Sequence, residues 1–410
     1  MPGSKSIANR SLFLAALAQG ESLLYNMPSS GDSAAFVECL KTLGVSVKYE
    51  RGAIIIDGRH MLHGDNATSP PLCMLDCKKA GTAARFMPAM LAPLAGEYII
   101  TASEQMLKRP MKPLLDALIA LGANIEYLQN VGHLPIKVIG RKMEGGAADI
   151  SVSESSQYLS ALLMSAPLYE KGLVISYSGR ADLPYVEITT KMMKSFGVSV
   201  TLEGNKFIVE KSFYTAREYY IEPDISAACY FYAAAFLTGG SVIVRGVRED
   251  SIQGDLRFLH ILRDLGAVLT NKPEGICLTG PAEYYGVDID LNNCSDQTMT
   301  LAVIAVFAKT PTTIRNIGHI RYQESNRISA VCAELKRMGI KCDESVDTLK
   351  IYPGAPRPTV IETYEDHRMA MAFSLAGLRA EGVEISNPEC SAKTFDGYFS
   401  EFERMIKCPK

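Results

Sequence analysis

One pattern of apolar and polar positions recurs along the chain: an apolar helix end, a glycine, and then the apolar or β-branched start of a strand. A glycine just beyond a helix terminus can adopt the left-handed conformation that closes off the last carbonyls, which gives the pattern a physical cause. Successive glycines of the pattern lie between 69 and 78 residues apart. They are Gly44, Gly122, Gly197, Gly266 and Gly339. This recurrence predicts an internally repeated α/β architecture.

The segments before these glycines carry apolar residues at helical spacing, and short apolar runs such as 52–56 and 206–209 predict strands. Three repeat units precede a boundary near Glu222 and three follow it, the last of them truncated and ending near Phe402. We therefore expect two similar halves, and ligands commonly bind between such halves.

Composition narrows the class of protein. A chain of 410 residues exceeds the size at which one core keeps growing, so two domains are expected. The formal charge of -3 excludes a general basic field for nucleic acid or a membrane surface. Without a long apolar run or a signal-like start, and with ten scattered cysteines expected to be reduced, the chain is interpreted as cytoplasmic. The H-x-x-H of His60 and His63 lacks the glutamate of a helical metal motif, so no metal is expected there.

The first candidate site is a loop of small residues at 2–6 that leads into an apolar helix predicted over 7–18. Backbone amides at a helix N-terminus favour an anion, and Lys5, Ser6 and Arg10 add charge and hydrogen-bond donors there. The alternative interpretation is a serine N-cap beside solvated cations.

The same half contains further polar clusters before predicted helices. Gly81, in the segment 80–85, would let a ligand approach the backbone, and 155–157 opens a helix predicted over 158–164. Arg109 adds another cation. Several such helix starts indicate phosphates or carboxylates as ligands, although serine and threonine are also common caps.

The second half contributes carboxylates and more cations. Asp296 precedes a predicted helix, Glu324 and Arg327 lie three residues apart, and 366–370 and 392–395 add basic residues. An isolated Glu–Arg pair at this spacing is more often a surface ion pair, but the neighbouring motifs favour a site. The acids are therefore expected from the second half, opposite the cations and helix starts of the first half, and the second half adds cations of its own.

In order and spacing, these motifs closely resemble the branch of the enolpyruvyl transferase family that acts on shikimate 3-phosphate. The motifs are P-G-S-K-S-x-x-N-R at 2–10, A-G-T-A-x-R at 80–85, S-S-Q at 155–157, P-Y with a following I-T at 184–189, E-S-x-R at 324–327, D-H-R-M-A-M at 366–371 and A-K-T-F at 392–395. The resemblance implies a two-domain inside-out α/β barrel, each domain built from three βαβαββ repeats, with the active site in the interdomain cleft. The implied domains are residues 5–221, and residues 222–410 with 1–4.

The resemblance also implies an activity: transfer of the enolpyruvyl group of phosphoenolpyruvate to the 5-hydroxyl of shikimate 3-phosphate, through a tetrahedral intermediate that then loses phosphate. It implies no metal, no organic cofactor and no nucleic-acid or membrane partner, and a monomer is expected. The residues implied for proton transfer are Lys5, Asp296 and Glu324. Those implied for phosphoenolpyruvate are Lys5, Gly81, Arg109, Gln157, Arg327, Arg368 and Lys393, with His367 nearby. Those implied for shikimate 3-phosphate are Lys5, Ser6, Arg10, Ser155, Ser156, Gln157, Tyr185, Asp296, His319 and Gln323.

Four positions near this implied site differ from the usual family pattern. Lys79 and His319 stand where asparagine is usual, Asp182 where serine is usual, and Gln323 where lysine is usual. The strand that usually precedes the first motif is also absent. These differences motivate one alternative, a non-catalytic or altered-specificity paralogue that binds a phosphorylated metabolite. A second alternative is a UDP-N-acetylglucosamine enolpyruvyl transferase, which the serine after the motif lysine disfavours.

Overall fold

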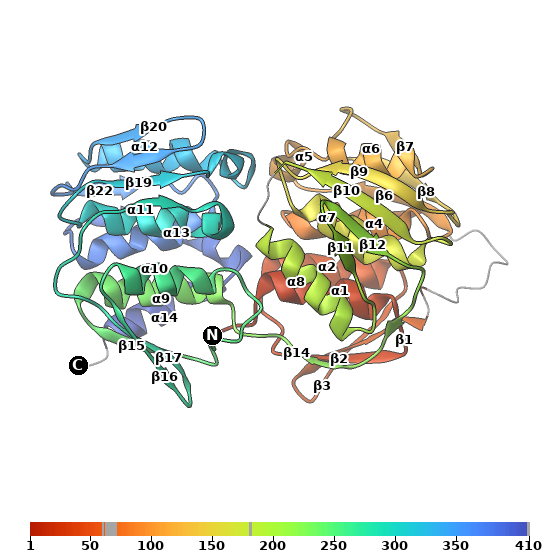
Figure 1. The fold of residues 1–410 in the computed structure, drawn as a ribbon, viewed down its shortest axis with the longest axis horizontal. Helices are drawn as coiled ribbons and strands as arrows, with labels where there is room; N and C mark the ends of the chain where they lie inside the picture. The colour runs from red at the N-terminus through yellow and green to blue at the C-terminus, as the bar shows by residue number, and fades with distance from the viewer. Residues whose placement is uncertain (60, 62–71, 180–182, 408–410) are drawn as a thin grey trace. The chain divides into compact units, whose positions relative to one another are not determined.

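The computed structural model describes residues 1–59, 61, 72–179 and 183–407, and its chain divides into two compact units (Figure 1). The N-terminal unit is Gly3–Ile221, and the C-terminal unit is Met1–Pro2 together with Glu222–Lys410. Each unit combines helices with several small sheets.

The first residues are divided between the units, whereas residues 1–4 were expected to belong to the C-terminal domain together with 222–410. Gly3 belongs to the N-terminal unit, where it approaches the backbone so closely that an added Cβ would lie 1.9 Å from the carbonyl oxygen of Asn26. The carbonyl of Pro2 instead accepts a hydrogen bond from the amide of Asp224, 2.9 Å away, in the C-terminal unit. The chain therefore changes units between residues 2 and 3 because neighbouring residues bind different partners.

The N-terminal unit contains seven α-helices, one 3-10 helix and fourteen strands among its described residues. The helices are α1 (Lys5–Ala16), α2 (Gly31–Thr42), α4 (Gly81–Leu91), α5 (Glu104–Leu107), α6 (Lys112–Ala120), α7 (Gln157–Ser165), η1 (Ala166–Leu168) and α8 (Pro184–Ser195). The strands are β1 (Ala18–Gln19), β2 (Glu21–Tyr25), β3 (Ser46–Glu50), β4 (Ala53–Asp57), β5 (Cys73–Asp76), β6 (Gly96–Thr101), β7 (Asn124–Tyr127), β8 (Ile136–Gly140), β9 (Gly146–Ser151), β10 (Leu173–Ser178), β11 (Thr201–Glu203), β12 (Lys206–Val209), β13 (Tyr214–Thr215) and β14 (Glu218–Tyr220).

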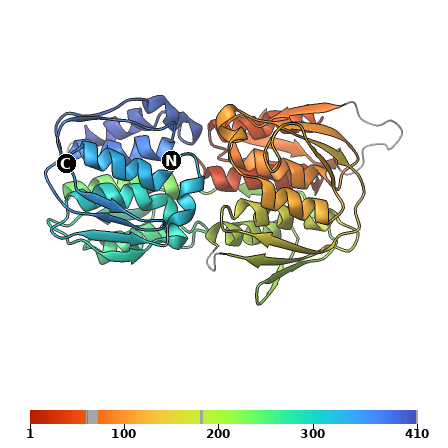
Figure 2. The same cartoon turned by 90° about the horizontal axis from the view of Figure 1, so that it is seen from above.

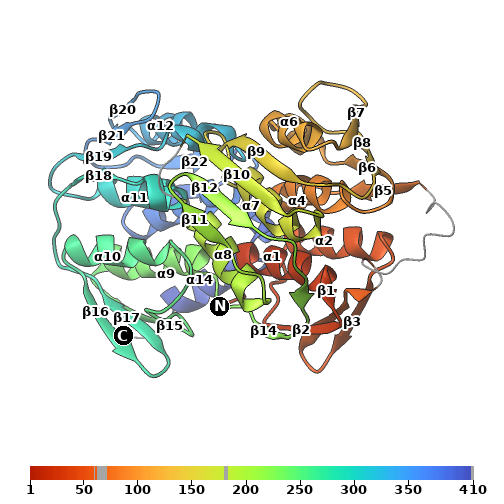
Figure 3. The ribbon, with the colours of Figure 1, turned by 45° about the vertical axis from the view of Figure 1, so that its right-hand side comes forward.

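Three sheets of this unit share one topology. Their strand orders are β14-β2-β4-β3, β5-β6-β8-β7 and β9-β10-β12-β11. In each sheet the first two strands are parallel and the other neighbours are antiparallel. Helices α1, α4 and α7 are buried along nearly their whole length, and strands of the sheets lie around them (Figures 2 and 3). The unit therefore has helices in its interior and sheets toward its surface.

The C-terminal unit repeats parts of this arrangement. Its helices are α9 (Ile225–Thr238), α10 (Leu256–Asp264), η2 (Asn292–Gln297), α11 (Thr298–Val306), η3 (Gly318–Tyr322), α12 (Arg327–Arg337), α13 (His367–Ser374), η4 (Leu375–Leu378), η5 (Pro388–Lys393) and α14 (Tyr398–Ile406). Its strands are β15 (Ser241–Arg245), β16 (Val268–Lys272), β17 (Gly275–Thr279), β18 (Asp288–Asp290), β19 (Thr312–Arg315), β20 (Cys342–Glu344), β21 (Leu349–Ile351), β22 (Thr359–Ile361) and β23 (Val383–Ile385).

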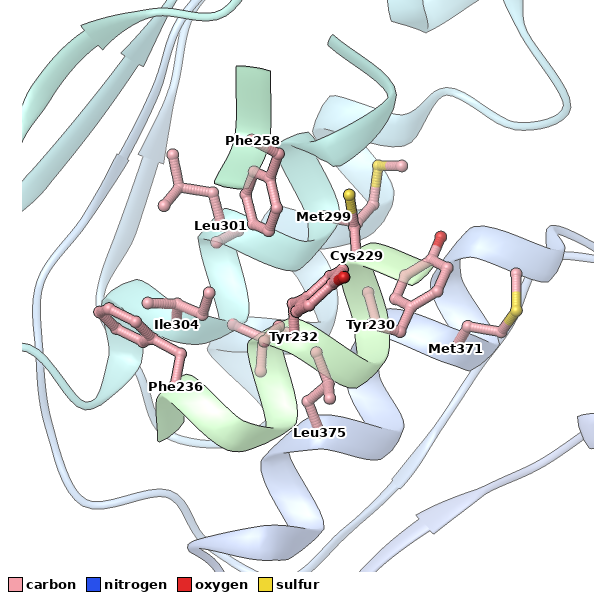
Figure 4. Packing of buried hydrophobic residues seen from close by; sticks show 14 of the residues in the cluster. Cys229, Tyr230, Tyr232, Phe236, Phe258, Met299, Leu301, Ile304, Met371 and Leu375 are labelled. Carbon is pink, nitrogen blue, oxygen red and sulfur yellow. The ribbon is translucent and has the colours of Figure 1, made fainter. Parts of the chain in front are cut away.

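The sheet β18-β19-β21-β20 has the topology of the N-terminal sheets, while β15-β17-β16 is antiparallel and β22-β23 is a parallel pair. The core of this unit lies between α9, α11, α13 and η4, where Tyr232, Met299, Ile304 and Leu375 pack together (Figure 4). Helices α9 and α11 are buried on almost every side because nearly all their residues are apolar or small.

The five helix–glycine junctions have one geometry. Each glycine lies two residues beyond the last residue of its helix and has φ between +80° and +109°. The amide of the following residue donates to the carbonyl five positions earlier, as from Val45 to Leu40 at 3.0 Å. The predicted left-handed helix closure is thus confirmed at all five positions. The first helix begins and ends two residues before the range predicted for it, and β12 matches the predicted 206–209.

The structure also bears on disulfides, membrane-spanning helices and metal-binding groups. The cysteines of the described chain include no disulfide. Among those same residues, no helix is long and apolar enough to cross a membrane, and no group of histidine, cysteine or acidic residues is placed to hold a metal ion. His60 and His63 lie outside the described residues.

Candidate functional site

In the N-terminal unit, the side chain of Lys5 stands at the first position of α1. Its ammonium lies 3.2 Å from the carboxylate of Asp32, in the first turn of α2, and the two side chains are 15% and 4% exposed. Lys5 is thus a mostly buried cation beside one carboxylate, at a helix terminus that itself favours negative charge.

Asn9, one turn further along α1, joins three helix N-termini. Its amide donates to the hydroxyl of Thr82, the second residue of α4, at 2.5 Å. Its carbonyl oxygen accepts from the hydroxyl of Ser33 in the first turn of α2 at 2.9 Å. Because Asn9 is fully buried, these bonds fix the starts of α1, α2 and α4 close together. Their combined partial positive charge favours an anion.

Arg10 joins the same end of α1 to α7 and α8. Its Nε donates to the hydroxyl of Thr189 at 2.7 Å, and its two terminal nitrogens donate to Ser160 and to the carbonyls of Ser6 and Tyr185. Burial lowers the pKa of Arg10 to about 10, so the guanidinium remains charged at neutral pH. Arg10 therefore holds Ser6 and Tyr185, two other residues predicted to bind shikimate 3-phosphate, through their backbones.

Replacing Arg10 with lysine should lower the free energy of unfolding by about 2 kcal/mol. Lysine keeps the charge, but its single ammonium cannot serve both hydroxyls and both carbonyls, so buried polar groups lose a donor. Urea denaturation at pH 7 measures this loss. Arg59→Lys is the control, because Arg59 binds Asp57 at the surface with its side chain 61% exposed. Equal midpoints for the two variants would contradict the structural role of Arg10.

Gly81 begins α4, where two guanidinium groups converge. A Cβ at this position would lie 2.8 Å from Arg109 and 2.9 Å from Arg85, so glycine leaves room for both. Arg85 is 1% exposed, donates to the amide oxygen of Gln157 at 3.0 Å, and lies 5.5 Å from the centroid of the Tyr158 ring. Gly81, Arg109 and Gln157, all predicted for phosphoenolpyruvate, are thus brought together around Arg85.

The start of α7 carries the predicted serines. The hydroxyl of Ser155 accepts from the amide of Gln157 at 3.3 Å, and Ser156 is the N-cap residue with 8% exposure. Arg85 of α4 donates to Gln157, and Arg10 donates both to Ser160 of α7 and to the carbonyl of Tyr185, so the first turns of α7 lie near Gly81 and Tyr185.

In the C-terminal unit, Arg327 is the centre of a network of charges. Its guanidinium binds Asp366 through two hydrogen bonds of 2.8 and 3.2 Å, Asp296 at 3.1 Å and Glu324 at 2.9 Å. Arg327 is 1% exposed. Burial by itself lowers the pKa of Arg327, but the three carboxylates outweigh it and raise the pKa above its ordinary value. The cation is therefore held permanently charged.

Two more cations complete the network. The guanidinium of Arg368 lies 2.8 Å from the second carboxylate oxygen of Asp296, and the ammonium of Lys393 lies 3.0 Å from Glu324. Asp296 and Glu324 each contact two cations, and their side chains are 13% and 12% exposed. The two acids predicted for proton transfer are thus held among the three cations predicted for phosphoenolpyruvate.

The positions that differ from the family pattern have different surroundings. Nε2 of His319 lies 2.7 Å from the hydroxyl of Ser295, the residue before Asp296, and Gln323 accepts a hydrogen bond from Arg327. Lys79 is exposed between β5 and α4, and Asp182 lies outside the described residues. His319 and Gln323 are therefore attached to the charged network of the C-terminal unit.

His367 and Asp366 are adjacent at the start of α13. His367 is 2% exposed, and its Nδ1 lies 3.8 Å from the carboxylate of Asp366. Asp366 is the N-cap of α13 and accepts from the amide of Arg368 at 3.0 Å. This bond closes the first turn of α13, which carries Arg368.

Asp32, Arg85 and Asp366 each contact a predicted site residue, although the sequence predicts no role for them. Arg85 and Asp366 stand inside the motifs 80–85 and 366–371, so the signal was present. Asp32 had no local signal, because its contact with Lys5 depends on how two helices pack.

Helix N-termini lined with cations in one unit, and cations interleaved with carboxylates in the other, define an α/β enzyme that handles small anions. Residues 1–402 match the family model of EPSP synthase (3-phosphoshikimate 1-carboxyvinyltransferase). The chain belongs to this family.

Individual relatives agree with the family match. The chain is 41% identical to a 3-phosphoshikimate 1-carboxyvinyltransferase of Nostoc punctiforme over 99% of this chain and 96% of the relative. It is 39% identical to the protein of that name from Aliivibrio salmonicida, with the same shares covered. Its structure resembles that of EPSP synthase from Acinetobacter baumannii with a TM-score of 0.81 at 25% identity, covering 98% of this chain and 94% of the other.

Proposed function

We propose that the protein transfers the enolpyruvyl group of phosphoenolpyruvate to the 5-hydroxyl of shikimate 3-phosphate. The products are 5-enolpyruvylshikimate 3-phosphate and phosphate, and the reaction is a step of the shikimate pathway toward chorismate and the aromatic amino acids. Membership of the EPSP synthase family supports the reaction. The observation that carries it is the network in which Asp296 and Glu324 lie among Arg327, Arg368 and Lys393.

The chemistry requires acids and bases beside fixed cations. When the tetrahedral intermediate forms, the 5-hydroxyl loses a proton and C3 of phosphoenolpyruvate gains one; C3 loses a proton again as phosphate leaves. We assign these transfers to Lys5, Asp296 and Glu324, because each is a titratable group at a mostly buried position next to charges of opposite sign.

The cations bind the anionic groups of the substrates in this proposal. Phosphoenolpyruvate contacts Arg327, Arg368 and Lys393 from the C-terminal unit, and the cluster around Gly81 and Arg109 from the N-terminal unit. Fixed donors stabilise developing negative charge without having to reorganise during the reaction, which is why buried, pre-paired cations suit this chemistry.

Shikimate 3-phosphate binds, in this proposal, beside the starts of α1, α7 and α8. Ser6, Ser155, Ser156 and Tyr185 would contact it directly, and Arg10 keeps Ser6 and Tyr185 in place through their carbonyls. In the other unit, His319 would contact it beside Asp296.

The finer architecture belongs to the same proposal. Sheets that repeat one strand order, together with buried α1, α4 and α7, support an inside-out α/β barrel built from βαβαββ repeats. The placement of the active site in an interdomain cleft stays a prediction, as do the cytoplasmic location and the monomeric state.

The two alternatives are less well supported. The relatives identified above carry the name 3-phosphoshikimate 1-carboxyvinyltransferase, which disfavours a UDP-amino-sugar substrate. A non-catalytic paralogue would not need Asp296 and Glu324 to remain paired with three cations in a nearly solvent-free cluster.

An assay of phosphate release tests the proposal. We expect release from phosphoenolpyruvate only when shikimate 3-phosphate is present, and none with UDP-N-acetylglucosamine as acceptor. Release with UDP-N-acetylglucosamine but not with shikimate 3-phosphate would favour the UDP-N-acetylglucosamine enolpyruvyl transferase. Binding of shikimate 3-phosphate without release of phosphate would favour the non-catalytic paralogue.

A further inference from the structure

Asp255, the residue before α10, carries a buried carboxyl group that the proposed reaction does not use. The residue is 7% exposed. One carboxyl oxygen accepts a hydrogen bond from the hydroxyl of Ser226 on α9, and the other accepts from the thiol of Cys294 at 3.6 Å. These two donors are neutral, whereas the acids of the charged network contact cations directly.

The segment that Asp255 contacts is the one that carries Asp296. Cys294 precedes Asp296 by two residues in η2 and has φ of -138° and ψ of 31°, so the backbone bends there. On the other side of Asp296, the side-chain amide (Nε2) of Gln297 donates to the carbonyl of Ser226 at 3.3 Å. Cys294 and Gln297 are almost fully buried. Asp255 and Ser226 therefore hold η2 on both sides of Asp296.

Charged and titratable groups face Asp255 from three other elements. They are Asp224 and Cys229 from the start of α9, Cys294 and Asp296 from η2, and Arg368 from α13. Cys229 of α9 and Phe258 of α10 belong to the same buried hydrophobic cluster (Figure 4). Arg368 is the cation of the group, and its guanidinium is already bound to Asp296.

The proton affinity of this carboxyl depends on that shared cation. Burial and then the negative charge of Asp296 raise the pKa of Asp255 to about 6, while Arg368 acts in the opposite direction. An anion bound to Arg368 would cancel part of the positive charge that both acids share. The acid with neutral donors should then accept a proton before Asp296, which retains Arg327 as a second cation.

We propose that Asp255 is a positioning residue for the transfer reaction: it holds the segment that carries Asp296, and it takes up a solvent proton when an anionic substrate binds Arg368, so that Asp296 stays ionised. The inference rests on the proposed function for the identity of the anion. Its consequence is that phosphoenolpyruvate binds more tightly as the pH falls toward 6, because the protonated carboxyl no longer repels it.

Asp255→Asn tests the proton uptake, because asparagine retains an oxygen for Ser226 but cannot ionise. Binding of phosphoenolpyruvate to the full chain is measured by calorimetry at one pH in two buffers of different ionisation enthalpy, which gives the number of protons taken up. We expect fewer protons in Asp255→Asn than in the wild type. Asp264→Asn, at the exposed end of the same helix, should match the wild type. Equal uptake in all three proteins would overturn the inference.

The pH profile separates this role from a purely structural one. At pH 8, Asp255→Asn should have a several-fold lower KM for phosphoenolpyruvate than the wild type, with kcat changed much less, since one buried negative charge is removed. A structural defect would raise KM instead, and that result would contradict the proposal.

A second variant keeps the test informative if Asp255→Asn does not fold. Ser226→Ala removes a donor that stabilises the ionised carboxyl, so the pH at which KM for phosphoenolpyruvate changes should move to a higher value. An unmoved profile would overturn the inference.

One outcome separates this inference from the proposed function. If the wild type took up Asp255-dependent protons but released no phosphate with shikimate 3-phosphate, the proton coupling would stand and the proposed transfer would be wrong.

Discussion

Replacing Lys5 with methionine should lower kcat for phosphate release by about 10³-fold. Methionine has a similar length but carries no charge and no proton, so both the positive charge at the start of α1 and the proton-transferring group are lost. The steady-state rate with both substrates measures the effect. Circular dichroism should give the spectrum of the folded wild type, because Lys5 lies at a helix end and not within the apolar core.

Two controls separate charge from proton transfer and from general damage. Lys5→Arg keeps the cation beside Asp32, so it should bind phosphoenolpyruvate better than the methionine variant while remaining slow in turnover. Lys41→Met removes a surface partner of Glu38 and should have wild-type turnover. Near-normal turnover in Lys5→Met would show that its ammonium has no part in the chemistry.

Arg327→Met should abolish turnover and lower the free energy of unfolding by about 3–5 kcal/mol at pH 8. The substitution leaves Asp366, Asp296 and Glu324 without the cation they share, and Asp366 is fully buried. The stability loss should be smaller at pH 5 than at pH 8, because protonation of a carboxyl removes a buried charge that is no longer balanced. Denaturation midpoints at the two pH values measure the difference.

The control for this substitution is Arg337→Met, on the same helix, where the guanidinium binds Glu334 but is 49% exposed. Because Glu334 is itself buried, we expect a smaller but measurable loss of stability and little change in kcat. Equal stability losses at pH 5 and pH 8 in Arg327→Met would contradict the view that unbalanced carboxylates cause the defect.

Local features of the fold could be predicted from the sequence because their causes are local. A glycine two residues beyond a helix end closes that helix whatever surrounds it, so Gly44 and its four counterparts marked real helix ends. The strand at 206–209 was equally recognisable as β12 from its short apolar run.

Pairings between distant segments could not be predicted in the same way. Strand β14 returns almost two hundred residues along the chain to lie parallel to β2, with Glu218 opposite Leu23. Nothing in the short run of residues around Tyr219 identifies that partner, because the pairing is decided by how the whole unit closes. Sheet order therefore had to come from the structure.

The same distinction holds for the candidate site: motifs identify its residues, but their long-range contacts come only from the structure. Motif residues such as Arg327 and Lys393 could be named from the sequence, and the structure brings them together with Glu324. The sequence did not indicate that Asp366 would bind Arg327 through two hydrogen bonds, or that Arg10 would be wholly enclosed by protein groups. Those contacts depend on burial, which motif spacing does not encode.

The charged network around Arg327 also bears on how substrates reach the C-terminal unit. Arg327, Arg368 and Lys393 are matched by Asp296, Glu324 and Asp366, so three positive charges face three negative ones. Such a balanced cluster projects little field into solvent and would not draw anions from a distance. If substrates bind here as proposed, the attraction would operate only at contact, when a phosphate or carboxylate takes the place of a protein carboxylate. Selectivity in this unit would then depend on exchange of partners and hardly at all on long-range steering.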